Sequence, residues 1–238
     1  MLSVIIPAYN EENRLPATLK EIGSYLDQGK TDYEIIVVDD GSKDKTTLKV
    51  KEIKNNNGRV QLLQNEKNRG KGLSVRKGIL AAQGEYILFY DADGSTPISE
   101  LEKLLEKLRA GYDIAIGSRG LKESQIRVRQ PFYREYMGKI FNRLVRLLTV
   151  PGIADTQCGF KCFRREAARE LFTLQKIKRF SFDVEILYLA QKRGYKIAEV
   201  PVVWMNSPVS RVGLIKDSLR MLFDLFRIRL IHGSDGKR

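Results

Sequence analysis

Histidine and cysteine are scarce in this 238-residue chain, which contains one histidine and two cysteines. So few soft ligands argue against a zinc centre or a disulfide framework, and Cys158 and Cys162 are expected to be reduced core thiols. Long apolar runs are also missing, because no stretch approaches the roughly 18 uncharged apolar residues of a membrane-spanning helix. Leu2–Ile6 runs into Pro7 without the apolar region or cleavage site of a signal peptide. We therefore expect a cytosolic or membrane-peripheral protein.

Acidic residues are the minority among the charged residues: 42 Lys and Arg stand against 29 Asp and Glu, a net charge of +13. Lys and Arg are dense in 119–147 and 161–179. This charge points to anionic partners such as nucleotides or phospholipids. Nucleic acid is not expected, because no recognised nucleic-acid-binding motif is present. Repeats and Pro- or Ser-rich linkers are absent as well, so a single catalytic domain is the default expectation.

Apolar runs alternate with helical patterns through the first half of the chain. The strand-like runs are Ser3–Ile6, Glu34–Val38, Val60–Leu63, Tyr86–Tyr90 and Asp113–Ile116. The helical patterns cover about 11–28, 44–56, 71–82 and 98–109. This order predicts an α/β fold with a mostly parallel sheet flanked by helices.

Two carboxylates, Asp91 and Asp93, directly follow the apolar run Tyr86–Tyr90. If that run is a buried strand, both leave its carboxyl end, where open α/β sheets bind ligands. Carboxylates this close repel each other unless a cation lies between them, and Mg²⁺ or Mn²⁺ suits such oxygen ligands. A solvated turn at Gly94 is the alternative interpretation.

Six separated blocks carry a resemblance to a known family. They are Val4–Glu11, Ile36–Ser42, Asn68–Gly72, Asp91–Gly94, Gly117–Arg119 and Asp155–Lys161. In this order and spacing, over about residues 2–212, the chain resembles family 2 glycosyltransferases of the GT-A (Rossmann-like) fold. The last two blocks resemble their polyprenyl-phosphate branch, the glucosyl enzymes slightly more than the mannosyl ones.

The resemblance implies a nucleotide pocket and a metal site. The nucleotide-binding set would be Pro7, Tyr9, Glu11, Asp40, Lys71 and Asp91. In it, Asp40 would accept a hydrogen bond from the base, and Lys71 would lie near the base or the diphosphate. Asp91 and Asp93 would hold Mg²⁺ or Mn²⁺, which offsets the charge on the departing diphosphate. Asp39 is expected only to cap the turn before the helix at 44.

The resemblance also implies inversion at the anomeric carbon by direct displacement. Asp183 falls where branches with hydroxyl acceptors have their catalytic base, although Phe182 replaces the usual acidic neighbour. A lipid phosphate arrives mostly ionised at neutral pH and needs no strong base, so Asp183 would then orient the acceptor. Asp155 is a second candidate catalytic carboxylate, with an N-cap or turn role as its alternative.

Cations beyond the metal are needed for a donor diphosphate and an acceptor phosphate. Arg119 and Lys161 are candidates for binding the acceptor phosphate, since an Arg fork can pair with two phosphate oxygens. Arg211 resembles the residue of the family's mobile loop that closes on the donor, and it joins the candidate catalytic set.

Two basic amphipathic segments lie in the second half, at 132–148 and 214–231. The first is expected to be an ordinary surface helix packed on the core. The second has a wider apolar arc, which favours docking at a membrane interface or homodimer packing. We accordingly divide the chain into a catalytic domain, 1–212, and a C-terminal amphipathic helix with a tail, 213–238.

The sequence therefore predicts a glycosyltransferase that moves a sugar from a nucleotide donor to a polyprenyl or dolichyl phosphate at the cytosolic face of a membrane. UDP-glucose is the favoured donor and GDP-mannose the alternative. Two other hypotheses stay open. One is a transferase that uses a saccharide or another hydroxyl acceptor, and the other is a non-catalytic nucleotide- or nucleic-acid-binding module.

Overall fold

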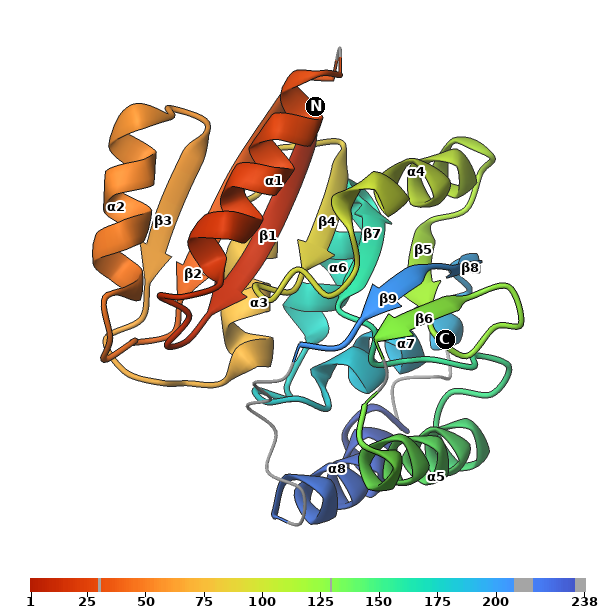
Figure 1. The fold of residues 1–238 in the computed structure, drawn as a ribbon. Helices are drawn as coiled ribbons and strands as arrows, with labels where there is room; N and C mark the ends of the chain where they lie inside the picture. Colours follow the sequence, from red (N-terminus) through yellow and green to blue (C-terminus); the bar gives the residue numbers. More distant parts are fainter. Residues whose placement is uncertain (30, 129, 208–215, 234–238) are drawn as a thin grey trace.

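A seven-stranded sheet forms the centre of the protein (Figure 1). The computed structural model describes residues 1–29, 31–128, 130–207 and 216–233. The strands of the sheet are β1 (Leu2–Ala8), β2 (Tyr33–Asp39), β3 (Val60–Gln64), β4 (Tyr86–Tyr90), β5 (Ile114–Ser118), β7 (Phe160–Arg164) and β8 (Ile197–Pro201). Their spatial order is β3-β2-β1-β4-β7-β5-β8. The predicted α/β class with a mostly parallel sheet is confirmed.

Strand β7 is the exception to the parallel order. It pairs antiparallel with β4, where Phe89 lies opposite Lys161, and antiparallel with β5, where Ile116 also lies opposite Lys161. The sequence analysis did not identify this strand, whose residues Phe-Lys-Cys-Phe-Arg form no continuous apolar run. Four of its five residues are buried. As a result, the segment that leads into β7 crosses the carboxyl ends of the parallel strands.

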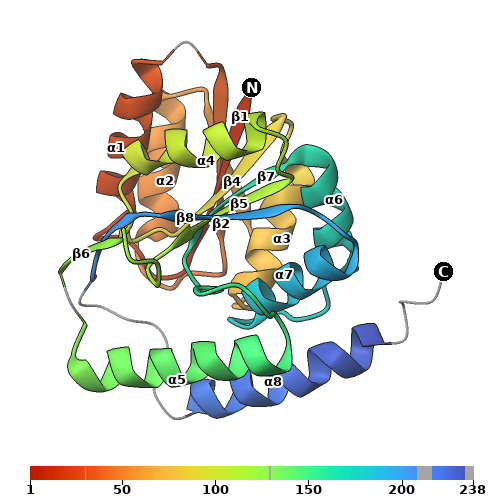
Figure 2. The same cartoon turned by 90° about the vertical axis from the view of Figure 1, so that its right-hand side faces the viewer.

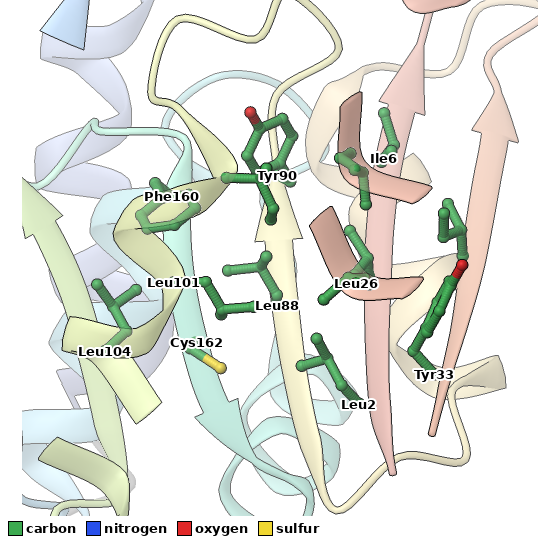
Figure 3. Packing of buried hydrophobic residues seen from close by; sticks show 14 of the residues in the cluster. Leu2, Ile6, Leu26, Tyr33, Leu88, Tyr90, Leu101, Leu104, Phe160 and Cys162 are labelled. Carbon is green, nitrogen blue, oxygen red and sulfur yellow. The ribbon is translucent and has the colours of Figure 1, made fainter. Parts of the chain in front are cut away.

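Helices cover both faces of the sheet, which explains why β1, β2 and β5 are buried along their whole length. One face carries α1 (Leu15–Asp27), α2 (Thr46–Asn56) and α4 (Leu101–Arg109), the last preceded by the short helix η1 (Ile98–Glu100). The other face carries α3 (Lys71–Ala81), α6 (Arg165–Leu174) and α7 (Phe182–Lys192). The buried apolar residues between the sheet and α1, α2 and α4 form one hydrophobic cluster. Figure 3 shows this cluster, in which Leu88 and Tyr90 of β4 lie near Phe160 of β7.

The ends of the elements differ in detail from the sequence prediction. The first helix begins at Leu15 rather than at 11, because Asn10 has a positive φ of 55° and the chain turns between Glu11 and Arg14.

Cys158 and Cys162 are free and buried, which confirms the prediction of reduced core thiols. Burial raises the pKa of Cys158 to about 11 and that of Cys162 to about 12, so neither thiol is reactive at neutral pH.

Two long helices, α5 (Phe132–Leu148) and α8 (Lys216–Gly233), lie side by side at the end of the molecule toward which the parallel strands point (Figures 1 and 2). Near them, β6 (Gln125–Val128) and β9 (Val203–Met205) form a separate two-stranded sheet. No helix in the described ranges is both long enough and apolar enough to cross a bilayer.

Helix α8 has two apolar sides. Leu225 and Ile228 are fully buried and belong to the same cluster as α3, α6 and α7. The other side is exposed and consists of Leu219, Phe223, Phe226 and Leu230. The wide apolar arc of the sequence is therefore divided between core packing and solvent. The predicted domain boundary at 212/213 lies outside the described residues.

Helix α5 is less completely packed than the sequence analysis expected. Val145 is buried and Phe141, Leu144 and Leu148 are partly buried against the core. Its remaining apolar residues are exposed: Phe132, Tyr133, Tyr136, Met137, Ile140 and Leu147. The expectation of an ordinary surface helix is thus only half right, because α5 also presents an uncovered apolar face.

Candidate active site

A cleft of about 990 Å³ lies between the carboxyl edge of the sheet and the α5/α8 pair. Its lining joins residues that are far apart in the sequence. The predicted site residues among them are Pro7, Tyr9, Glu11, Asp40, Lys71, Asp91, Asp93, Arg119, Asp155 and Asp183. Met137 and Phe141 of α5 and Met221 of α8 form part of the same lining. Arg211 lies outside the described residues.

Asp91 directly follows β4 and is held by backbone contacts. Its amide donates a hydrogen bond to the Gly159 carbonyl over 3.0 Å. A Cβ atom at Gly159 would lie only 2.0 Å from Asp91 Oδ2, so this approach requires a glycine. Lys71 Nζ, at the start of α3, lies 2.7 Å from Asp91 Oδ1. Burial raises the pKa of Asp91, and Lys71 only partly opposes this effect.

Asp93 lies near Arg14, a residue that the sequence analysis did not include in the site. Its Oδ1 accepts a hydrogen bond from the Ser95 amide, and its Oδ2 lies 4.0 Å from the guanidinium of Arg14. Arg14 also binds both carboxylate oxygens of Glu11, over 2.7 and 2.5 Å, and donates to Ser207 Oγ over 2.7 Å. The three-residue spacing from Glu11 was the available signal for this pair.

The pair Asp91 and Asp93 fits a hard divalent cation. Carboxylate oxygens are the ligands that Mg²⁺ and Mn²⁺ prefer, and such ions commonly take only one or two from the protein and the rest from substrate phosphates and water. Within the described part of the chain, no group of three or more His, Cys, Asp and Glu residues could hold a metal by itself. A cation at this pair would therefore depend on oxygens of the bound nucleotide.

Asp40 stabilises the loop that precedes α3. Its carboxylate accepts hydrogen bonds from the side-chain amide of Asn65 over 2.8 Å and from the backbone amides of Arg69 and Gly70 over 2.9 and 2.8 Å. Gly70 has a φ of 106°, a conformation that favours glycine. Recognition of the base by Asp40 stays a prediction, and the structure adds a loop-shaping role to it.

Asp39 has the capping role that we expected. It accepts a hydrogen bond from the Ser42 hydroxyl and another from Thr47 Oγ1 over 3.0 Å. It is 2% exposed and is not part of the lining of the cleft that holds Asp91.

Lys161 is not placed as a ligand of the acceptor phosphate. Its ammonium donates to the Cys158 carbonyl and to Asp183 Oδ1, each over 2.5 Å, and its side chain is 2% exposed. The antiparallel strand β7 turns this side chain into the protein below the cleft. Lys161 therefore holds Asp183 in position instead of reaching the cleft itself.

Arg119 and Asp155 form a bidentate pair. The guanidinium lies 2.6 and 2.9 Å from the two oxygens of Asp155, and the backbone amide of Arg119 adds a third bond of 3.0 Å. Glu199 accepts hydrogen bonds from the amides of Ala154 and Asp155 and so fixes this loop. Burial opposes the charge of Asp155, but Arg119 outweighs it and lowers the pKa of Asp155 to about 2. Such a carboxylate is a poor proton acceptor at neutral pH, and its bidentate pair with Arg119 gives Asp155 a structural role in this loop.

The mostly parallel sheet, its helices and the two adjacent carboxylates in the cleft agree with the GT-A-type enzyme fold that the sequence resemblance implied. Residues 3–172 match the model of the family described as Glycosyl transferase family 2, and the chain belongs to this family. It is 42% identical over 240 residues to the dolichyl-phosphate beta-glucosyltransferase of Dictyostelium discoideum, covering 96% of this chain and 73% of that protein.

A second relative agrees with this assignment, and a solved structure shares the fold. The Homo sapiens dolichyl-phosphate beta-glucosyltransferase is 42% identical over 242 residues, which cover 96% of this chain and 75% of that protein. The fold is similar to that of glucosyl-3-phosphoglycerate synthase from Mycobacterium tuberculosis in complex with Mn²⁺, UDP and phosphoglyceric acid. That structure gives a TM-score of 0.73 at 20% identity and covers 97% of this chain and 77% of the other.

Proposed function

We propose that this protein transfers glucose from UDP-glucose to a dolichyl or similar polyprenyl phosphate, with inversion at the anomeric carbon. The observation that carries the proposal is one continuous cleft that joins Asp91 and Asp93 to apolar side chains of α5 and α8. A polar donor and a lipid acceptor could thus meet in one cavity. The names of the relatives, dolichyl-phosphate beta-glucosyltransferases, support the same reaction.

The donor would bind along the ends of β1, β2 and β4. Pro7, Tyr9, Glu11 and Asp40 line this part of the cleft and would surround the nucleoside, and Lys71, which lies beside Asp91, would contact the diphosphate. When bound at Asp91 and Asp93, Mg²⁺ or Mn²⁺ neutralises the charge of the leaving diphosphate. GDP-mannose is the alternative donor that the binding test must include.

The acceptor phosphate would be the nucleophile. One of its oxygens attacks the anomeric carbon, the bond from that carbon to the donor diphosphate breaks, and the diphosphate leaves with the electron pair. Because the phosphate is mostly ionised at neutral pH, no residue has to remove a proton from it. Asp183, fixed by Lys161, would then orient a sugar hydroxyl or the acceptor. Arg119 borders the cleft as a candidate cation for phosphate.

The apolar sides of α5 and α8 would contact a membrane surface. Phe132 of α5 and Phe223 of α8 are 84% and 79% exposed, and Arg220 and Arg227 are exposed on α8 near Phe223 in the sequence. Apolar side chains below the headgroups with Arg and Lys beside anionic lipid are typical of interfacial helices. Location at the cytosolic face stays a prediction from the sequence, and homodimer packing is the competing explanation of this surface.

The test is an incubation of the protein with Mn²⁺ or Mg²⁺, a panel of nucleotide sugars and a short-chain polyprenyl phosphate, followed by mass spectrometry of the lipid. We expect a hexosyl phosphate lipid that forms with UDP-glucose and disappears when EDTA is added. Turnover with soluble sugars in the absence of lipid phosphate would favour the hydroxyl-acceptor hypothesis. Salt-sensitive polynucleotide binding without any transfer would favour the non-catalytic module.

A further inference from the structure

Glu185 is a completely buried carboxylate in α7 that the proposed reaction does not use. Its two oxygens accept hydrogen bonds from the amides of Lys176 and Ile177, each over 2.8 Å. The third partner is His232, the only histidine of the chain, whose Nε2 lies 2.7 Å from Glu185 Oε1. His232 lies near the end of α8 and is 2% exposed. One carboxylate therefore joins α8 to the segment before α7.

That segment, 175–179, packs against the start of α3. The side-chain amide of Gln175 donates to the carbonyls of Gly72 and Ile177, over 2.9 and 2.7 Å. The amide of Leu73 donates to the Lys178 carbonyl over 3.1 Å. A Cβ atom at Gly72 would lie 2.9 Å from the Ile177 carbonyl oxygen, so the two segments are as close as a glycine allows.

The first residue of α3 is Lys71, whose ammonium pairs with Asp91. A continuous series of hydrogen bonds thus runs from His232 through Glu185, Ile177 and Gln175 to the first turn of α3. Removing one partner from a buried carboxylate leaves its desolvation uncompensated, and the remaining groups must rearrange. Any such rearrangement at Glu185 would reach the amides of 176 and 177 first.

We propose that Glu185 and His232 are positioning residues for donor binding. They hold segment 175–179 against α3 and thereby keep Lys71 beside Asp91, so that the hydrogen bond from His232, rather than the apolar packing of α8, contributes to the affinity for the donor nucleotide. This inference rests on the proposed function in one respect, which is that the cleft binds a nucleotide diphosphate. It also gives α8 a second role besides covering the core.

The apolar contacts of α8 provide a matched control. Ile228 is fully buried in the cluster beneath α8, and its aliphatic side chain takes no part in the hydrogen-bond series. Its truncation should destabilise the protein through lost packing. It should leave the hydrogen bonds of Glu185 in place. Stability and donor affinity can therefore be separated on the same helix.

The experiment compares His232→Phe, Gln175→Met and Ile228→Ala in the full chain. UDP binding with Mn²⁺ is measured by calorimetry, and unfolding is measured by thermal denaturation. We expect the first two variants to weaken UDP binding about three- to tenfold. Ile228→Ala should lower Tm at least as much and leave the Kd for UDP within about twofold of wild type. His232→Gln, which can still donate to Glu185, should restore most of the affinity.

A double variant tests the connection directly. If His232 and Gln175 act through one series, combining the two substitutions weakens UDP binding less than the product of the single effects. Hydrogen exchange at the amides of Leu73 and Ile177 gives a readout that needs no nucleotide, and it should accelerate in His232→Phe but not in Ile228→Ala.

Several results would overturn the inference. It fails if His232→Phe binds UDP like wild type, or if Ile228→Ala weakens UDP binding as much as His232→Phe. If His232→Phe does not fold, Gln175→Met and the same control decide. A wild-type protein that binds neither UDP nor GDP would refute the proposed function, whereas the exchange rates would still decide whether α8 is linked to α3.

Discussion

Asp91 and Asp155 each face a cation across the same cleft. The Asp91 side chain is 31% exposed and has one short contact to Lys71, and burial raises its pKa. The Asp155 side chain is 3% exposed, accepts two bonds from the guanidinium of Arg119 and has a pKa of about 2. The first carboxylate is partly open and has a single ion-pair partner, while the second is buried in a bidentate pair.

Under the proposed function, this difference would separate the part of the cleft that binds the metal from the part that shapes the cleft. A carboxylate that must take up a metal with the donor and release it afterwards has to be open and only loosely neutralised. A carboxylate that fixes the 152–158 loop against β5 benefits from full burial and bidentate geometry. Asp183, paired with Lys161 at the base of the cleft, is buried like Asp155, and both belong to the lining.

The largest effect is expected for Asp93→Asn. If the open pair holds the metal, this change removes one of its two carboxylates and should lower kcat/KM about a hundredfold or more, while Tm changes little. The measurement is glucosyl transfer to polyprenyl phosphate over a series of Mn²⁺ concentrations. Near-normal turnover of the variant in EDTA would show that Asp93 is not a metal ligand.

Asp183→Asn tests whether the buried pair with Lys161 takes part in the chemistry. We expect about a ten- to hundredfold slower transfer, because the acceptor loses an orienting group. Between pH values of roughly 7 and 9 the rate should acquire no new pH dependence, since a phosphate acceptor is already ionised there. Rescue of the variant at high pH would instead identify a hydroxyl acceptor with Asp183 as its base.

Asp155→Asn should affect stability more than chemistry. The pKa of Asp155 lies at about 2 in the folded protein, below its ordinary value of 3.8. Its contribution is therefore complete above pH 3.8 and is lost as the pH falls toward 2, and it amounts to about 2 kcal/mol. Urea denaturation at neutral pH should show this loss in the variant, and the difference from wild type should shrink near pH 2.5.

The smallest effect concerns the exposed side of α8. Removal of the whole helix is a poor test, because Leu225 and Ile228 belong to the core. Phe223→Ser with Leu230→Ser should instead weaken sedimentation with anionic vesicles about tenfold, since each side chain loses part of its transfer free energy. Leu48→Ser, which changes an exposed leucine of α2, is the matched control. Unchanged vesicle binding together with a loss of dimers would favour homodimer packing.

Much of the proposed donor-binding part of the cleft could be predicted from the sequence, because the motifs that form it are local. Asp91 and Asp93 directly follow an apolar strand, and parallel strands bring their carboxyl ends to one edge. The rest of the cleft depends on the antiparallel strand β7, which no local sequence pattern predicts. Phe160–Arg164 is apolar at only three of its five positions, so Lys161 was placed on the surface, although it lies buried beneath Asp183. The Glu185–His232 contact joins residues 47 positions apart and has no sequence signal at all.

Gly159 shows a limit of the experiments by which sites are usually mapped. Alanine scanning measures what is lost when side-chain atoms are removed. At position 159 the function depends instead on the absence of a side chain. Alanine here would be an addition, a methyl group 2.0 Å from Asp91 Oδ2, where no methyl group fits. Random mutagenesis should find Gly159 intolerant of every replacement, the smallest included, although glycine itself contributes no chemistry to the cleft.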